Sequence, residues 1–184
     1  MYWWPDAYFI DAEKQLEAQV RDMAEHGLKT VVLYSSDGVP KVTFDGEKAR
    51  FDYSRVDQIL TLLKKYGFLG PIPVYSPDTS VEKALPEGMD LDSKIGRKAL
   101  AELIRGMIER YHSYGFEVYF KPVDEPASKG PTFEAAWTRL KRIKKVVPEC
   151  KTFCTVRIAQ AQALDPWLDV RCYGGLGDGW VQAA

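Results

Sequence analysis

Two kinds of residue pattern alternate along this chain: short runs rich in β-branched and aromatic residues, and longer segments in which apolar residues recur every three or four positions. The first pattern is typical of strands and the second of helices. When a helix connects one strand to the next, the two strands pair in parallel through a right-handed crossover. The sequence therefore predicts an α/β fold of parallel (β/α) repeats, with the loops that follow the strands gathered at one edge of the sheet.

Five segments have the composition of strands and the spacing that such repeats require. They are Lys29–Tyr34, Pro71–Tyr75, Glu117–Phe120, Thr152–Val156 and Asp169–Tyr173. The aromatic run Tyr2–Asp6 is a candidate for the end of an earlier strand, which gives five or six in all. A complete barrel has eight strands and about 250 residues. We therefore expect residues 1–184 to form one partial TIM-barrel-like domain, a portion of a larger barrel; an open sheet is the alternative.

Four helices are expected between these strands. The first begins near Asp11 and stops at Gly27, the second runs from Tyr53 or Ser54 to Tyr66, and the fourth runs from Thr132 to Pro148, with Asp11 and Thr132 as candidate N-caps. The third has the longest apolar stripe: Leu100, Leu103, Ile104, Met107, Ile108 and Tyr111. A further short turn or helix is expected around Ala159–Leu164.

Charge and composition argue against several classes of partner. The chain has 25 basic and 26 acidic residues, so nothing in its overall charge favours nucleic acid or an anionic membrane. It contains no apolar run of the roughly 20 residues that a membrane-spanning helix needs, and no export signal is predicted. With three cysteines and two histidines, neither a disulfide framework nor a metal site is expected. No cofactor is predicted, and location and oligomeric state stay open.

Two adjacent carboxylates follow the strand around Val118. Asp124 and Glu125 lie between Pro122 and Pro126. Neighbouring side chains of a regular strand point to opposite faces, so both acids can serve one site only where the pleat breaks after Phe120, as the prolines favour. Two carboxylates in one pocket repel, which keeps a proton on one of them. Such an acid beside a negative charge suits glycoside cleavage; an exposed Asp-Glu-Pro turn is the alternative.

The segment Tyr119–Pro126 resembles the catalytic segment of (β/α)-barrel glycoside hydrolases, in which the fourth strand ends in Asn-Glu-Pro or Asp-Glu-Pro. The Asp-Glu form looks most like the family 123 β-N-acetylgalactosaminidases. The resemblance implies that Glu125 is the acid/base residue and that Asp124 orients the 2-acetamido group of the substrate, which itself attacks the anomeric carbon. It also implies a retaining glycosidase that acts on β-linked N-acetylhexosamine, with a carbohydrate as its binding partner.

Two other functions stay open. One is a two-carboxylate retaining mechanism, in which a second carboxylate lies about 5–5.5 Å from the acid. After Val156 the only acids are Asp165, Asp169 and Asp178, so that nucleophile would lie outside this chain. The other is a non-catalytic (β/α) module that binds carbohydrate or a protein partner.

Sugar sites combine polar groups with aromatic rings. Asp37, Tyr75, Tyr173 and Trp4 are the candidates for substrate binding, because each lies at or near an expected strand end. Trp3 and Tyr34 are weaker aromatic candidates. Rings of this size also bury area in any core or rim, and Asp37 in Ser36-Asp37-Gly38 equally fits a turn.

Overall fold

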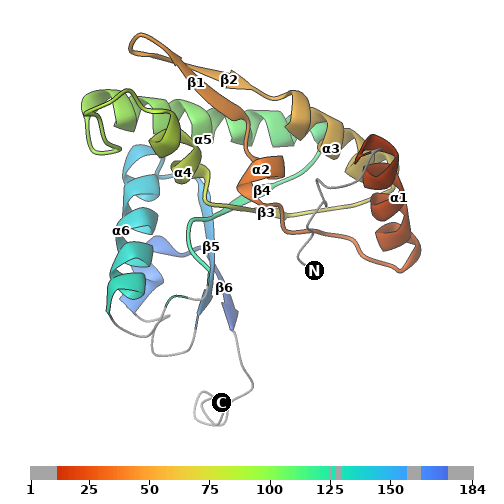
Figure 1. Ribbon diagram of the computed structural model, residues 1–184. Helices are drawn as coiled ribbons and strands as arrows, with labels where there is room; N and C mark the ends of the chain where they lie inside the picture. The colour runs from red at the N-terminus through yellow and green to blue at the C-terminus, as the bar shows by residue number, and fades with distance from the viewer. Residues whose placement is uncertain (1–11, 125, 127–129, 157–162, 174–184) are drawn as a thin grey trace, which may run out of the picture.

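Four parallel strands form the main sheet of the computed structural model (Figure 1), which describes residues 12–124, 126, 130–156 and 163–173. They are β3 (Ile72–Tyr75), β4 (Val118–Lys121), β5 (Lys151–Val156) and β6 (Val170–Tyr173), in that spatial order. Every neighbouring pair is parallel. The predicted α/β class with parallel (β/α) repeats is therefore confirmed.

The predicted strand at Lys29–Tyr34 is only partly formed. Among the described residues it makes one isolated parallel bridge, Leu33 with Val74, rather than a ladder of several pairs. The Leu33 amide donates to the Pro73 carbonyl and the Tyr75 amide donates to the Leu33 carbonyl, both at 2.9 Å. The segment thus lies parallel to β3 at the edge of the sheet and pairs with it at a single position. It is short because the one-turn helix α2 (Ser35–Gly38) begins directly after Tyr34.

The four predicted helices are α1 (Ala12–Glu25), α3 (Ser54–Lys65), α5 (Lys94–Tyr114) and α6 (Pro131–Val146). Their apolar stripes are buried as expected, including Val56, Ile59, Leu60 and Leu63 in α3. In α6, Gly130 rather than Thr132 is the N-cap, because Pro131 occupies the first turn, where its missing N–H costs nothing. Trp137 of α6 is 37% exposed, and the Lys141 ammonium lies 4.4 Å from its ring centre.

Two elements were not predicted: the hairpin β1 (Lys41–Asp45) with β2 (Lys48–Asp52), and helix α4 (Pro77–Ala84). The short turn or helix expected around Ala159–Leu164 lies mostly outside the described residues, and the 3-10 helix η1 (Asp165–Trp167) follows directly after it. In the hairpin, Gly46 and Glu47 form a two-residue loop, and Gly46 has φ 59°. Glycine at the first loop position is typical of a type II′ turn. The dipeptide Asp45-Gly46 was therefore a usable signal for this hairpin.

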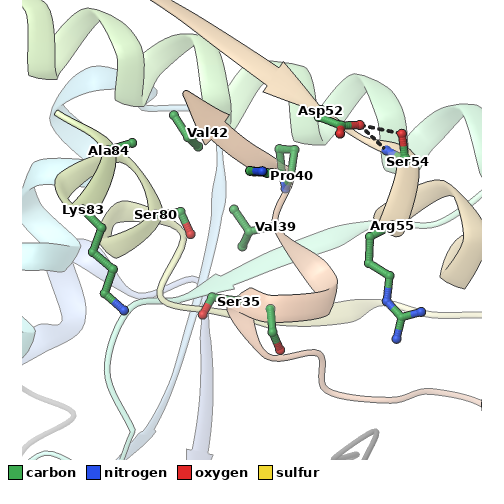
Figure 2. Close-up of a pocket in the computed structure, with 12 residues that line it drawn as sticks. Ser35, Val39, Pro40, Val42, Asp52, Ser54, Arg55, Ser80, Lys83 and Ala84 are labelled. Atoms are coloured by element: carbon green, nitrogen blue, oxygen red, sulfur yellow. Dashed lines mark hydrogen bonds between the residues drawn. The ribbon is translucent and has the colours of Figure 1, made fainter. Parts of the chain in front are cut away.

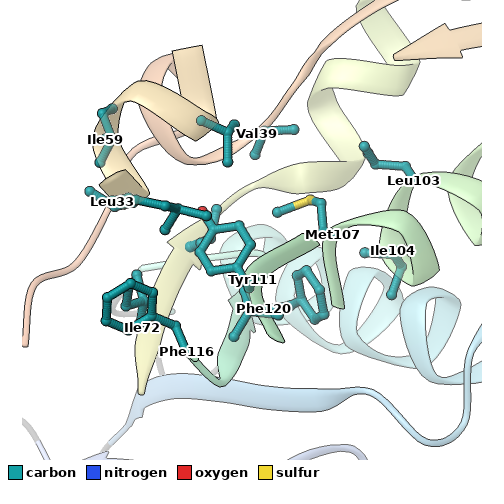
Figure 3. Packing of buried hydrophobic residues seen from close by; sticks show 14 of the residues in the cluster. Leu33, Val39, Ile59, Ile72, Leu103, Ile104, Met107, Tyr111, Phe116 and Phe120 are labelled. Atoms are coloured by element: carbon teal, nitrogen blue, oxygen red, sulfur yellow. The ribbon is translucent and has the colours of Figure 1, made fainter. Parts of the chain in front are cut away.

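The main core lies between the sheet and the helices. In Figure 1, α5 and α3 lie above β3 and β4, and α6 lies to the left of β5. Figure 3 shows Tyr111 of α5 packed among buried aliphatic side chains near Leu33 and Ile72. Strand residues that face these helices belong to this core: Leu33, Ile72, Val74, Val118 and Phe120. Because side chains alternate along a strand, Tyr75 and Lys121 face the other side of the sheet.

A close backbone approach fixes the position of α2. A Cβ atom at Gly38 would lie 2.7 Å from the Leu33 Cβ and 2.9 Å from the Val74 Cγ1, so only glycine lets α2 lie this close to the sheet. The buried Tyr111 hydroxyl donates to the Gly38 carbonyl at 2.7 Å. Helix α5 thereby holds the loop that carries Asp37 against β3.

No described helix combines the length and the apolar character needed to cross a membrane.

The buried hydrogen bond of Tyr111 gives a test of this packing. Replacing Tyr111 by Phe leaves the Gly38 carbonyl without its donor, and we expect the free energy of unfolding to fall by about 1–3 kcal/mol. Tyr119→Phe is the matched control, because its hydroxyl bonds Glu117 at the exposed surface and its loss should cost far less. Urea unfolding measures both, and equal losses would contradict the buried role of Tyr111.

Candidate functional site

The carboxyl ends of β3, β4 and β5 meet at a buried lysine. Lys121 is the last residue of β4, lies opposite Tyr75 in the sheet register, and is 0% exposed. Its Nζ donates to the Tyr75 hydroxyl at 2.8 Å, to the Thr155 hydroxyl at 2.9 Å and to Asp124 Oδ1 at 2.5 Å. A buried ammonium is tolerated only when oxygen atoms replace its hydration shell, and these three side chains supply them.

Aromatic rings complete the surroundings of this ammonium. The Lys121 Nζ lies 4.6 Å from the ring centre of Tyr75 and 5.2 Å from that of Phe153. Tyr34 stacks on Tyr75 with ring centres 4.9 Å apart and an interplanar angle of 10°. Cation–π contacts of this kind stabilise a desolvated cation. We call Tyr75, Lys121, Asp124 and Thr155 the lysine cluster.

The predicted break in the backbone occurs one residue later than expected. Strand β4 ends at Lys121 rather than Phe120, and the chain bends at Val123 and Asp124. The bend brings the Asp124 carboxylate back onto the ammonium of Lys121, three residues earlier. The break therefore turns Asp124 toward the same edge of the sheet as the strand ends.

Residue Ser76 anchors this bend from the neighbouring strand. Its amide donates to the Lys121 carbonyl at 2.9 Å, and its hydroxyl donates to the Pro122 carbonyl at 3.1 Å. Ser76 has φ 46°, a left-handed conformation that costs energy in a residue other than glycine. This strained serine at the β3–α4 junction makes two hydrogen bonds to the segment that carries Asp124.

Three aspartates follow strand ends, and they differ in exposure. The Asp37 side chain is 8% exposed and pairs with Arg55, whose Nε donates to it at 3.0 Å. The Asp78 side chain is 2% exposed, and Arg139 of α6 binds both of its oxygens, with Nε 2.6 Å from Oδ2. The Asp124 side chain is 42% exposed. Of these three, Asp124 alone combines a fixed position with access to a solute.

Several predicted site residues lie outside what the structure describes. Glu125 and Trp4 are not among the described residues, so the pairing of Asp124 with Glu125 stays a prediction, as does the role of Trp4. Tyr173 ends β6 opposite Val156, and its role also stays a prediction. Asp37 is held by Arg55 and by the Ser36 hydroxyl, which donates to it at 2.8 Å, and its role in substrate binding stays a prediction.

Neither Lys121 nor Thr155 is among the site residues that the sequence predicts. The available signal was positional. Tyr75 and Lys121 are the last residues of two successive short strands, Ile72–Tyr75 and Val118–Lys121. Residues at matching strand ends become neighbours in a parallel sheet, which places the phenol beside the ammonium.

Neither the two buried cysteines nor the metal-binding residue types form a second reactive site in the described part of the chain. Burial raises the pKa of Cys150 and of Cys154 to about 12, which keeps both thiols protonated near neutral pH. Among the described residues, no three His, Cys, Asp or Glu side chains are grouped as a metal site requires.

Comparisons with solved structures give distant similarities. No family model matches the chain, and no curated protein matches it. The crystal structure of endoglucanase Cel5A from Pseudomonas stutzeri aligns with 78% of this chain and 44% of its own, at 14% identity and a TM-score of 0.41. The chain thus spans less than half the length of that enzyme.

The ion pair of the lysine cluster can be measured by a double-mutant cycle. We expect a coupling energy of about 1–3 kcal/mol between Lys121→Met and Asp124→Asn, because the ammonium is desolvated. The control cycle is Lys98→Met with Glu102→Gln, an exposed pair 3.9 Å apart on α5. Its coupling should be several-fold smaller. Equal coupling in the two cycles, from urea unfolding, would show that burial adds nothing to the Lys121 pair.

The thiols should separate into two classes. Cys150 and Cys154 are buried and Cys172 is exposed. We expect one thiol of the folded protein to react with a chromogenic disulfide reagent at pH 8 and all three to react in denaturant. Rapid reaction of three thiols in the folded state would contradict the burial of the two cysteines.

Proposed function

We propose that this chain carries the acid/base part of a glycoside hydrolase active site, which acts on β-linked N-acetylhexosamine by a substrate-assisted retaining mechanism. The observation that supports it is the Lys121–Asp124 ion pair at the end of β4. It fixes a half-exposed carboxylate immediately before Glu125, at the sheet edge where (β/α) folds place their reactive groups. In this proposal residues 1–184 are a portion of a larger barrel of the family 123 kind.

In the first step Asp124 and Glu125 have different tasks. The Asp124 carboxylate accepts a hydrogen bond from the N–H of the 2-acetamido group and turns its carbonyl oxygen toward the anomeric carbon. That oxygen forms a bond to the anomeric carbon as the glycosidic bond breaks, and Glu125 gives its proton to the departing oxygen. The product is a cyclic oxazolinium ion, whose positive charge the Asp124 carboxylate stabilises.

In the second step Glu125 acts as a base. Its carboxylate takes a proton from a water molecule, the water oxygen bonds to the anomeric carbon, and the bond from the acetamido oxygen breaks. Glu125 regains its proton and the acetamido group returns to its neutral form. Two displacements at one carbon give net retention of configuration.

Lys121 acts in this scheme as a positioning residue. Its ammonium is fixed by the Tyr75 and Thr155 hydroxyls, so the ion pair holds Asp124 at a defined place without a contact to the sugar. Tyr75 is 6% exposed, and we assign its hydroxyl to the same positioning task. Alignment of a reacting group is worth several kcal/mol of activation energy when that group is held by a rigid neighbour.

Glu125→Gln tests the assignment. With an aryl β-N-acetylhexosaminide, we expect kcat/KM to fall by about 10²–10⁴, because the amide can neither give nor take the proton. Glu117→Gln is the matched control, since Glu117 lies just before the opposite end of β4. Turnover that survives Glu125→Gln would contradict the assignment.

Two further measurements separate the alternatives. Sugar binding by the wild-type chain without turnover would favour a non-catalytic module. A thiazoline that mimics the oxazolinium ion should bind and inhibit. If it fails to bind while Glu125→Gln still abolishes turnover, the nucleophile is a second carboxylate and the acetamido group does not participate.

A further inference from the structure

A groove lined by both polar and apolar side chains lies among the segments that follow Tyr34 and β3. Figure 2 shows it between α4, the short helix α2 and the start of α3, with a volume of about 560 Å³. That volume is within the range of about 300–1,000 Å³ typical of small-molecule sites. It is lined by Ser35, Ser36, Val39, Pro40, Lys41, Val42, Asp52, Ser54, Arg55, Ser80, Lys83 and Ala84.

Positive charge exceeds negative charge in this groove. Three lining side chains are cationic: Lys41, Lys83 and Arg55. Asp37 pairs with Arg55 from behind the lining, and Asp52 lies opposite Lys41 in the hairpin register. Three cations against these two acids leave one net positive charge. Among the described acidic residues, none forms an ion pair within 4.0 Å of Lys41 or Lys83.

Hydrogen-bond donors are also in excess. Four serines line the groove, and the one acid among its lining residues, Asp52, accepts from the Ser54 amide at 2.9 Å and from the Ser54 hydroxyl at 2.5 Å. In Figure 2 the Lys83 ammonium points toward Ser35 across the opening. The hydroxyls of Ser36 and Ser54 already donate to Asp37 and Asp52. The donors that the groove offers to the oxygen atoms of an anion are therefore its lysine ammonium groups and the hydroxyls of Ser35 and Ser80.

Two short stretches of chain join the groove to the lysine cluster. Tyr34, which stacks on Tyr75, is followed directly by Ser35 and Ser36 of the groove. Ser76, which donates to the Pro122 carbonyl, is four residues before Ser80, and Ser80 lines the groove from α4. The groove and the lysine cluster are therefore connected by the segments that directly follow Tyr34 and β3.

We infer that this groove is a subsite for an anionic substituent of the sugar chain, a sulfate ester or a carboxylate. The inference rests on the proposed function for the sugar itself and adds the substrate class, an acidic oligosaccharide. Lys41 and Lys83 supply the charge, and the hydroxyls of Ser35 and Ser80 supply further donors. Arg55 is fixed by its ion pair with Asp37 and forms part of the groove lining.

Direct binding tests this inference without any need for turnover. The Glu125→Gln protein is titrated with a sulfated N-acetylhexosamine, a hexuronic acid, the neutral N-acetylhexosamine and inorganic sulfate, with calorimetry as the readout. We expect an anionic sugar to bind more tightly than the neutral one. Comparing the sulfated sugar with the hexuronic acid then identifies which anion the groove selects.

The double variant Lys41→Met/Lys83→Met, made in the same background, should weaken binding of the anionic sugar by about tenfold and leave the neutral sugar unaffected. The control is Lys48→Met/Lys64→Met, which removes two exposed lysines from the hairpin tip and from the end of α3. It should bind like the parent. Thermal melting and the neutral sugar report on folding, and the single variants serve if the double variant unfolds.

Equal affinity of parent and double variant for the anionic sugar would overturn the inference. So would an anionic sugar that binds no better than the neutral one, or equal weakening in both double variants. Turnover of a neutral aryl substrate without anion binding would contradict the proposed subsite and still support the proposed function. Anion binding that depends on Lys41 and Lys83, without any turnover, would support the subsite and count against the hydrolase.

Discussion

The architecture of the candidate site depends on one desolvated ammonium. Lys121 is fully buried, and among the described residues its oxygen partners come from β3, from β5 and from the bend after β4. Removing a cation from water is costly unless several acceptors surround it. The positions of Tyr75, Thr155 and Asp124 are therefore linked, and the bend that presents Asp124 follows from the need to complete the shell of Lys121.

The three aspartates that follow strand ends differ in their roles: two stabilise the packing of helices, and one is placed to contact a substrate. Asp37 and Asp78 are each buried against an arginine, which ties α2 to α3 and α4 to α6. Asp124 is tied instead to a lysine that the sheet itself immobilises, and its carboxylate stays half-exposed. Rigid surroundings and a solvent-accessible oxygen are both needed by a residue that orients a substrate group. The proposed mechanism assigns that task to Asp124 for this reason.

Much of the fold was predictable because the apolar residues that face the core recur in the sequence with the period of a helix or a strand. The stripes of α3 and α5 and the apolar strands β3 to β5 follow directly from which residues face the core. The hairpin was missed although Asp45-Gly46 marks its turn, and α4 was missed because it is a short helix directly after a strand. The lysine cluster was out of reach for another reason. A lysine is ordinarily a surface residue, and only the pairing of separate strands shows that Lys121, Tyr75 and Thr155 meet.

The buried lysine also has a bearing on how the strands align. Side chains alternate between faces, so shifting β4 by one residue against β3 would turn Lys121 toward the helices, among Val74, Tyr111 and other members of the apolar core. There the ammonium would meet few oxygen atoms, and the misaligned sheet would carry the full desolvation penalty. A polar group at the end of β4 therefore discriminates against slipped pairings that hydrophobic side chains alone would tolerate, and it ties correct assembly of the sheet to assembly of the site.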